Sequence, residues 1–150
     1  MRRPRWYALL AVTLAGMVVA VLVDTTLGPV ALVLIANLPL GVVGHVHLVG
    51  PVVLLVATWL TMAVGGIVVG MLMPSRLAAV AYAATSVLAV GAGFLVYPEA
   101  AGQLEGYVGL PTLVIEAVLV VASMVSGAWA GWWAGQRVRR WVGRSRAPAT

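Results

Sequence analysis

The stretch TLVIEAVLVVASMVSGAWAGWWAGQ, residues 112–136, decides the fold class of this chain. It contains a single ionisable residue, Glu116, among apolar, small and neutral side chains. A helix of about 20 mostly apolar residues is long enough to cross the hydrocarbon core of a bilayer. We therefore predict a transmembrane helix over residues 112–136.

Three other segments satisfy the same requirement: residues 6–23, 51–73 and 77–97. The chain of 150 residues is 63% hydrophobic and only 9% charged, whereas soluble domains have about 25% charged residues. No soluble fold buries so large an apolar fraction, so we expect an all-α polytopic membrane protein with one transmembrane domain. Because cysteine is absent, disulfides, thiolate metal sites and cysteine nucleophiles are excluded.

A fifth apolar segment, residues 29–49, is long enough to cross a bilayer but is interrupted by polar residues, glycines and Pro39. Cytoplasmic flanks collect Lys and Arg, and four crossings with both termini inside place all nine basic residues in the cytoplasm. Five crossings that start outside put the three N-terminal arginines on the wrong side. We therefore expect four crossings, an outer turn over residues 24–28, and a re-entrant or interfacial segment over residues 29–49. Five transmembrane helices remain the alternative.

The formal net charge of +5 lies at the predicted helix ends, so nucleic acid is not an expected partner. Residues 137–150 are predicted to form a basic cytoplasmic tail that lies on the inner leaflet and binds anionic lipids. Every basic residue is arginine, which we regard as typical of a prokaryotic chain. The expected location is the cell membrane of a prokaryote, with both termini cytoplasmic.

Small residues four positions apart allow two helix backbones to approach closely in a membrane. Such rows predict tight packing, either within one chain or between protomers. Around the last predicted helix, Trp129 and Trp132 fall on the side opposite the small residues, where they suit a membrane interface. The rows are Ser123, Gly127, Gly131 and Gly135; Ala81, Thr85, Ala89 and Gly93; Met62, Gly66 and Gly70; and the shorter pair Gly16 and Ala20.

Glu116 is the first candidate for a functional residue. An ionisable group inside a span is costly unless it is paired or hydrated, so it is a functional hypothesis by default. At about 100° per residue, Glu116 falls on the same stripe as Ser123 and Gly127. We expect its carboxylate to face the bundle and to handle protons or cations, with a local hydrogen bond or contact with outer water as the structural alternative.

His45 and His47 form an H-x-H pair, a spacing that is familiar in metal sites. On extended backbone the two side chains share a face, whereas on a helix they diverge by about 200°. The pair is predicted to lie on the same membrane side as Glu116. Two histidines and a carboxylate could hold zinc, copper or iron, so a divalent metal site is a second hypothesis. The structural alternative is a pair of interfacial histidines.

Packing signals are abundant in this chain and chemical motifs are scarce. No phosphate-binding loop, dinucleotide fingerprint or H-E-x-x-H motif occurs in the sequence. We therefore expect a non-enzymatic membrane subunit that self-associates or serves a larger membrane complex. The alternative is a small oligomeric transporter or channel protomer that uses Glu116, with the broken segment around Pro39 lining its path.

Overall fold

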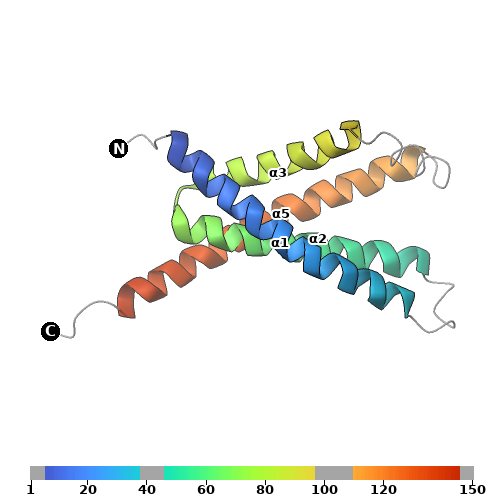
Figure 1. Ribbon diagram of the computed structural model, residues 1–150, viewed down its shortest axis with the longest axis horizontal. Helices are drawn as coiled ribbons and strands as arrows, with labels where there is room; N and C mark the ends of the chain where they lie inside the picture. The colour runs from blue at the N-terminus through green and yellow to red at the C-terminus, as the bar shows by residue number, and fades with distance from the viewer. Residues whose placement is uncertain (1–5, 38–45, 97–109, 146–150) are drawn as a thin grey trace.

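The computed structural model describes residues 6–37, 46–96 and 110–145, and these ranges form four helices without any strand (Figure 1). The helices are α1 (Trp6–Ala36), α2 (Val46–Leu72), α3 (Arg76–Val96) and α5 (Leu110–Ser145). Each contains a stretch long and apolar enough to cross a membrane. The prediction of an all-α polytopic membrane fold with four spanning helices is confirmed.

α1 does not end at Val23, and the predicted turn over residues 24–28 is wrong. The helix runs without interruption from Trp6 to Ala36 and contains Pro29. The hydroxyls of Thr25 and Thr26 donate hydrogen bonds of 2.8 and 2.7 Å to carbonyl oxygens three residues earlier in the same helix. Polar side chains that bond to their own backbone do not have to leave the helix, and proline is tolerated in spanning helices when nearby groups satisfy the backbone.

The segment 29–49 is likewise not a separate element in the described part of the chain. Residues 29–36 complete α1, and residues 46–49 form the first turn of α2. Residues 38–45, which include Pro39 and His45, lie outside the described residues. The prediction of a re-entrant segment rests on polar residues, glycines and Pro39, most of which lie in this undescribed part, whereas Pro29 at the start of the segment lies inside α1.

The four helices alternate in direction, so that the start of α1 and the end of α5 lie at the same end of the bundle (Figure 1). α1 crosses the other helices obliquely, and α2 and α5 form the most extensive pair. Ser75 ends the short connection before α3, where its Oγ accepts a 3.2 Å hydrogen bond from the Leu77 amide as a helix N-cap. The described arginines lie at the end of the bundle where α1 starts and α5 ends: Arg76 begins α3, and the others are in the last turns of α5.

α5 packs on α2 along its row of small residues. Ser123 Oγ donates a 2.8 Å hydrogen bond to the Leu55 carbonyl oxygen, and a Cβ atom at Gly127 would lie 2.5 Å from the carbonyl oxygen of Trp59. Each contact repeats four residues later on both helices. The successive pairs are Ser123 with Leu55, Gly127 with Trp59, Gly131 with Ala63, and Gly135 with Ile67.

α2 contributes its own glycines to this line of contact between α2 and α5, which we call the seam of α2 and α5. A Cβ atom at Gly66 would lie 2.5 Å from the carbonyl oxygen of Ala128, and Gly70 lies against the backbone of Trp132. Beyond Gly70, Gln136 Nε2 donates a 3.3 Å hydrogen bond to the Gly70 carbonyl oxygen. The small residues of both helices therefore bring the two backbones together within one chain.

A second close contact joins α1, α2 and α3. A Cβ atom at Gly65 would lie 2.6 Å from the carbonyl oxygen of Gly16 and would also meet the hydroxyl of Tyr82. Tyr82 is fully buried, and its hydroxyl donates a 3.4 Å hydrogen bond to the Met62 carbonyl oxygen. Glycines thus give room for one large aromatic side chain at the centre of the core.

The prediction that Trp132 faces outward, opposite the glycines, is wrong. The residue is 8% exposed and belongs to the core, while its ring packs on Trp129 with 5.2 Å between centroids. α5 contacts α3 as well as α2, so the side of α5 away from its glycines is not left entirely free. Trp133 is exposed, and the Arg137 guanidinium lies 3.6 Å from the centre of its ring.

α5 continues to Ser145, so residues 137–145 extend the spanning helix instead of forming a separate one.

Candidate functional site

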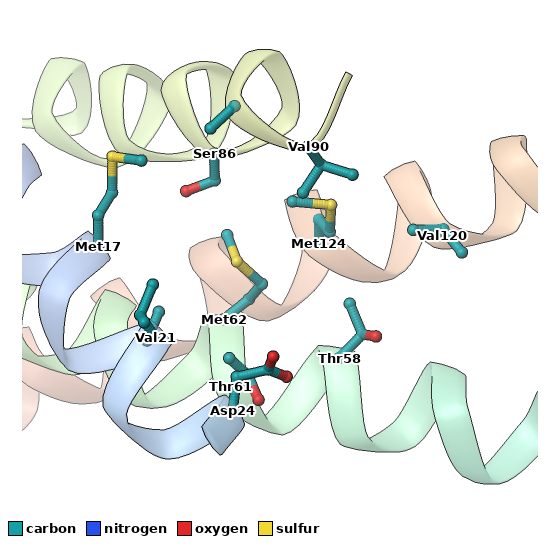
Figure 2. A pocket seen from close by; sticks show the side chains of 12 residues that line it. Met17, Val21, Asp24, Thr58, Thr61, Met62, Ser86, Val90, Val120 and Met124 are labelled. Carbon is teal, nitrogen blue, oxygen red and sulfur yellow. The ribbon is translucent and has the colours of Figure 1, made fainter. Parts of the chain in front are cut away.

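A cavity of about 300 Å³ lies between the four helices and contains the polar side chains of Asp24, Thr58, Thr61 and Ser86 (Figure 2). Asp24 comes from α1, the two threonines from α2, and Ser86 from α3. α5 supplies Val120 and Met124, and the remaining lining residues are apolar. One carboxylate and three hydroxyls from three helices therefore border the same space.

The cavity lies at the mid-depth of the bundle. Ser86 is the central residue of α3, and Thr58 and Thr61 flank the centre of α2. Asp24 is the nineteenth of the 31 residues of α1, so it also lies near the middle of its helix. A carboxylate at this depth is costly in a bilayer unless it is paired or hydrated. Asp24 is therefore the residue most in need of a functional explanation.

Thr61 adds an independent indication. The residue is 7% exposed, and its Oγ1 is buried without a hydrogen-bond partner in the described part of the chain. Three other helical threonines, Thr25, Thr26 and Thr85, instead donate to carbonyl oxygens of their own helices. A buried polar atom left without a partner costs about 1–3 kcal/mol.

Two further buried polar atoms have no partner in the described residues, Thr13 Oγ1 and Trp132 Nε1. Neither residue lines the central cavity. Thr61 therefore differs from both, because its unsatisfied oxygen belongs to a residue in the wall of a space large enough for a ligand. Ser86, which is 6% exposed, lines the same space from α3.

Glu116 lies apart from this cavity, in a smaller pocket of about 150 Å³ between α2 and α5. Its side chain is half-buried and faces the first half of α2, on the side of the helix that also carries Ser123. The other residues of this pocket are Pro51, Leu54, Leu55, Thr58, Leu119 and Val120. The structure thus places Glu116 against α2, although not in the central cavity.

The proposed metal ligands are only partly described. His45 lies outside the described residues, and His47 is in the first turn of α2, one turn before Pro51 in the Glu116 pocket. Across residues 6–37, 46–96 and 110–145, no group of three His, Cys, Asp or Glu side chains could hold a metal ion. A divalent metal site of His45, His47 and Glu116 stays a prediction.

Sequence reasoning missed the central site because it assigned Asp24 to a turn. Gly16, Ala20 and Asp24 are spaced four residues apart. A prediction that continued the first helix past Val23 would therefore have placed Asp24 on the same packing face as Gly16 and Ala20. Nothing in the sequence marked Thr58 and Thr61 as site residues, since threonine is common in spanning helices.

Comparison with models of protein families, with curated proteins and with solved structures finds no match for this chain. The geometry of the bundle is therefore the basis for assigning a role.

Proposed function

We propose that this protein binds a small monovalent cation at Asp24, at the mid-depth of its helix bundle, and passes it across the membrane. The observation that carries the proposal is the shared cavity of Asp24 and the unpartnered Thr61 hydroxyl. Carboxylate and hydroxyl oxygens are suitable ligands for hard cations. The role belongs to the transporter or channel class, with Asp24 in place of Glu116 as the principal residue.

The charge of the site favours a monovalent ion. Among the described residues that line the cavity, Asp24 is the only acidic one and none is basic. One monovalent cation forms a neutral pair with one carboxylate, whereas a divalent ion would keep a net positive charge in a medium of low dielectric constant. Three hydroxyls supply further oxygen atoms without adding charge. A proton on Asp24 satisfies the same charge balance, and the test below separates the two.

The orientation proposed for this role places both termini in the cytoplasm of a prokaryotic cell. Arg76 and the arginines of the last turns of α5 support it, because cytoplasmic flanks collect basic residues. The basic end of α5 is suited to anionic lipid headgroups. The pocket of Glu116 then lies toward the outer face.

The test is ion flux in liposomes that contain the purified protein. Tl⁺ influx, followed with an enclosed fluorescent dye, should fall to the protein-free level in Asp24→Asn. Thr26→Val should keep wild-type flux, because the Thr26 hydroxyl bonds to its own helix and lies outside the cavity lining. Acidification of the lumen without Tl⁺ entry would identify the proton as the transported ion. Equal Tl⁺ flux in Asp24→Asn and wild type would refute the role of Asp24.

A second candidate role is a non-enzymatic subunit that self-associates or joins a larger membrane complex. It is favoured by small residues of α3 that remain exposed: Thr85, Gly93 and Ala89, the last of which also lines the central cavity. A Cβ atom at Gly93 would meet no atom of the described residues within 4 Å. An apolar groove of about 480 Å³ also lies between α3 and α5 and includes Val87 and Val125. Small residues on an uncovered helix face are suited to contact with a further helix.

This second role is tested by the mass of the protein in lipid nanodiscs, measured by light scattering. Gly93→Leu should convert an oligomer to monomers, because a bulky side chain prevents close approach of another helix. Leu77→Ala, a change at a large exposed residue of the same helix that does not line the groove, is the control. A monomeric wild-type protein without a co-purifying membrane partner would exclude this role.

A further inference from the structure

The Asp24 cavity and the Glu116 pocket are adjacent and share part of their wall. Thr58 of α2 and Val120 of α5 line both spaces. Figure 2 shows these two side chains on the same side of the cavity, opposite Met17. The two carboxylates of the described spans thus border neighbouring spaces that are separated by a threonine and a valine side chain.

The two spaces succeed each other along the seam of α2 and α5. The smaller pocket includes Pro51 and Glu116, which are the sixth residue of α2 and the seventh of α5. The cavity begins at Thr58 and continues to Met62, so it lies deeper along the same helix. A path through both spaces therefore starts near one end of the bundle and ends at its centre.

Beyond the cavity, toward the other end, the same helices are in backbone contact. Gly131 lies against the Ala63 carbonyl, and a Cβ atom at Gly66 would be 2.5 Å from the carbonyl oxygen of Ala128. Between α1 and α2, a Cβ atom at Gly65 would likewise lie 2.6 Å from the carbonyl oxygen of Gly16. Contacts of this kind leave no room for an ion between these backbones, so the seams themselves provide no path toward that end.

The surface of the bundle beside Asp24 offers no alternative route. Asp24 is exposed, but at the mid-depth of the bundle this exposure faces the hydrocarbon core, which an ion does not enter. An ion therefore has to reach Asp24 along the helices. The Glu116 pocket is the space with a charged side chain that leads there.

We infer that Glu116 forms the outer binding position of a one-sided access route, from which a monovalent cation passes Thr58 to reach Asp24. The inference rests on the proposed function of Asp24. Glu116 attracts the cation and balances its charge near the end of the bundle, where the pocket is otherwise apolar except for Thr58. The Thr58 hydroxyl is available to both spaces and can supply an oxygen to the ion as it moves between the carboxylates.

The experiment measures Tl⁺ influx into liposomes by stopped-flow fluorescence and Tl⁺ binding at equilibrium by calorimetry. Glu116→Gln should slow influx by about tenfold or more, since a charged cleft raises the association rate of a counter-ion by about 10- to 1000-fold. Equilibrium binding at Asp24 should persist in this variant. Thr58→Val should also slow influx, whereas Thr85→Val, whose hydroxyl bonds to its own helix, should not.

Four outcomes separate the possibilities. Slow influx with retained binding in Glu116→Gln supports the route. Wild-type influx in Glu116→Gln, combined with no influx in Asp24→Asn, overturns the route and leaves the function of Asp24 intact. Loss of all binding in Glu116→Gln also overturns it, because Glu116 would then belong to one common site. Wild-type influx in Asp24→Asn refutes the proposed function itself, and the route with it.

A second measurement tests the route without removing either carboxylate. The chain has no cysteine, so Leu54→Cys introduces a single thiol into the wall of the Glu116 pocket. A membrane-impermeant cationic thiol reagent applied to one side should block influx, and Tl⁺ should slow the modification. Wild-type influx after complete modification would overturn the route even if the Glu116 variant fails to fold.

Discussion

Gly131 of α5 lies so close to Ala63 of α2 that a Cβ atom at position 131 would overlap the Ala63 carbonyl oxygen. Backbone meets backbone at this point, and neither helix can yield by rotating a side chain. In a bilayer, where apolar side chains gain nothing by leaving lipid for one another, such close approach is a main source of helix association. The seam of α2 and α5 therefore holds these two helices together.

Gly131→Ala should destabilise the protein by about 1–3 kcal/mol, the usual cost of overpacking. Gly91→Ala is the matched control, because a Cβ atom at Gly91 of α3 meets nothing within 4 Å. That change should be neutral or stabilising by up to about 1 kcal/mol, since alanine is the better helix former. Denaturant unfolding in mixed micelles measures both. Equal stability of the two variants would contradict the packing of α5 on α2.

Gly65→Ala and Tyr82→Phe should be coupled. The added methyl group meets the Tyr82 hydroxyl, the Gly16 carbonyl oxygen and the Tyr82 ring carbon Cζ, so removal of the hydroxyl relieves the closest contact and leaves the other two. Gly65→Ala should therefore cost less in the Tyr82→Phe background, with a coupling of about 0.5–3 kcal/mol as found for residues in contact. A double-mutant cycle of unfolding free energies tests this. Additive effects would mean that Tyr82 does not pack on Gly65.

Single-cysteine variants should establish the crossing number and the sidedness of the helices. Ser75 precedes α3, Gly143 lies near the end of α5, and Asn37 follows α1. With four crossings, Ser75→Cys and Gly143→Cys react with an impermeant thiol reagent only from the cytoplasmic side, and Asn37→Cys only from the outside. The absence of native cysteine keeps the background low. Labelling of Ser75→Cys and Gly143→Cys from opposite sides would contradict the four-helix arrangement.

The sequence determined the fold class because lipid imposes one dominant requirement. A spanning segment must satisfy its backbone internally and be apolar for about 20 residues, and four segments of this chain do so. The third predicted span, residues 77–97, differs from α3 by one residue at each end. The small-residue row of α5 was also visible in the sequence, since its period of four matches the helix.

Helix ends were less predictable where polar and helix-breaking residues occur within a helix. The sequence predicts that the first span ends at Val23, yet α1 continues for 13 residues beyond it to Ala36. The hydroxyls of Thr25 and Thr26 bond to carbonyl oxygens within the helix, so these polar residues do not end it. Such bonds depend on side-chain geometry that a hydropathy pattern does not contain.

Only the tertiary structure decided which residues face one another. The sequence did not indicate whether the Gly131 row would contact α2 or another protomer, since small residues suit either contact equally. It also did not reveal that Asp24 would line one cavity with Thr61 and Ser86, because these residues come from three helices and their levels depend on how the helices cross. Period and composition determine the helices, whereas the depth at which their polar residues meet is determined by how the helices cross.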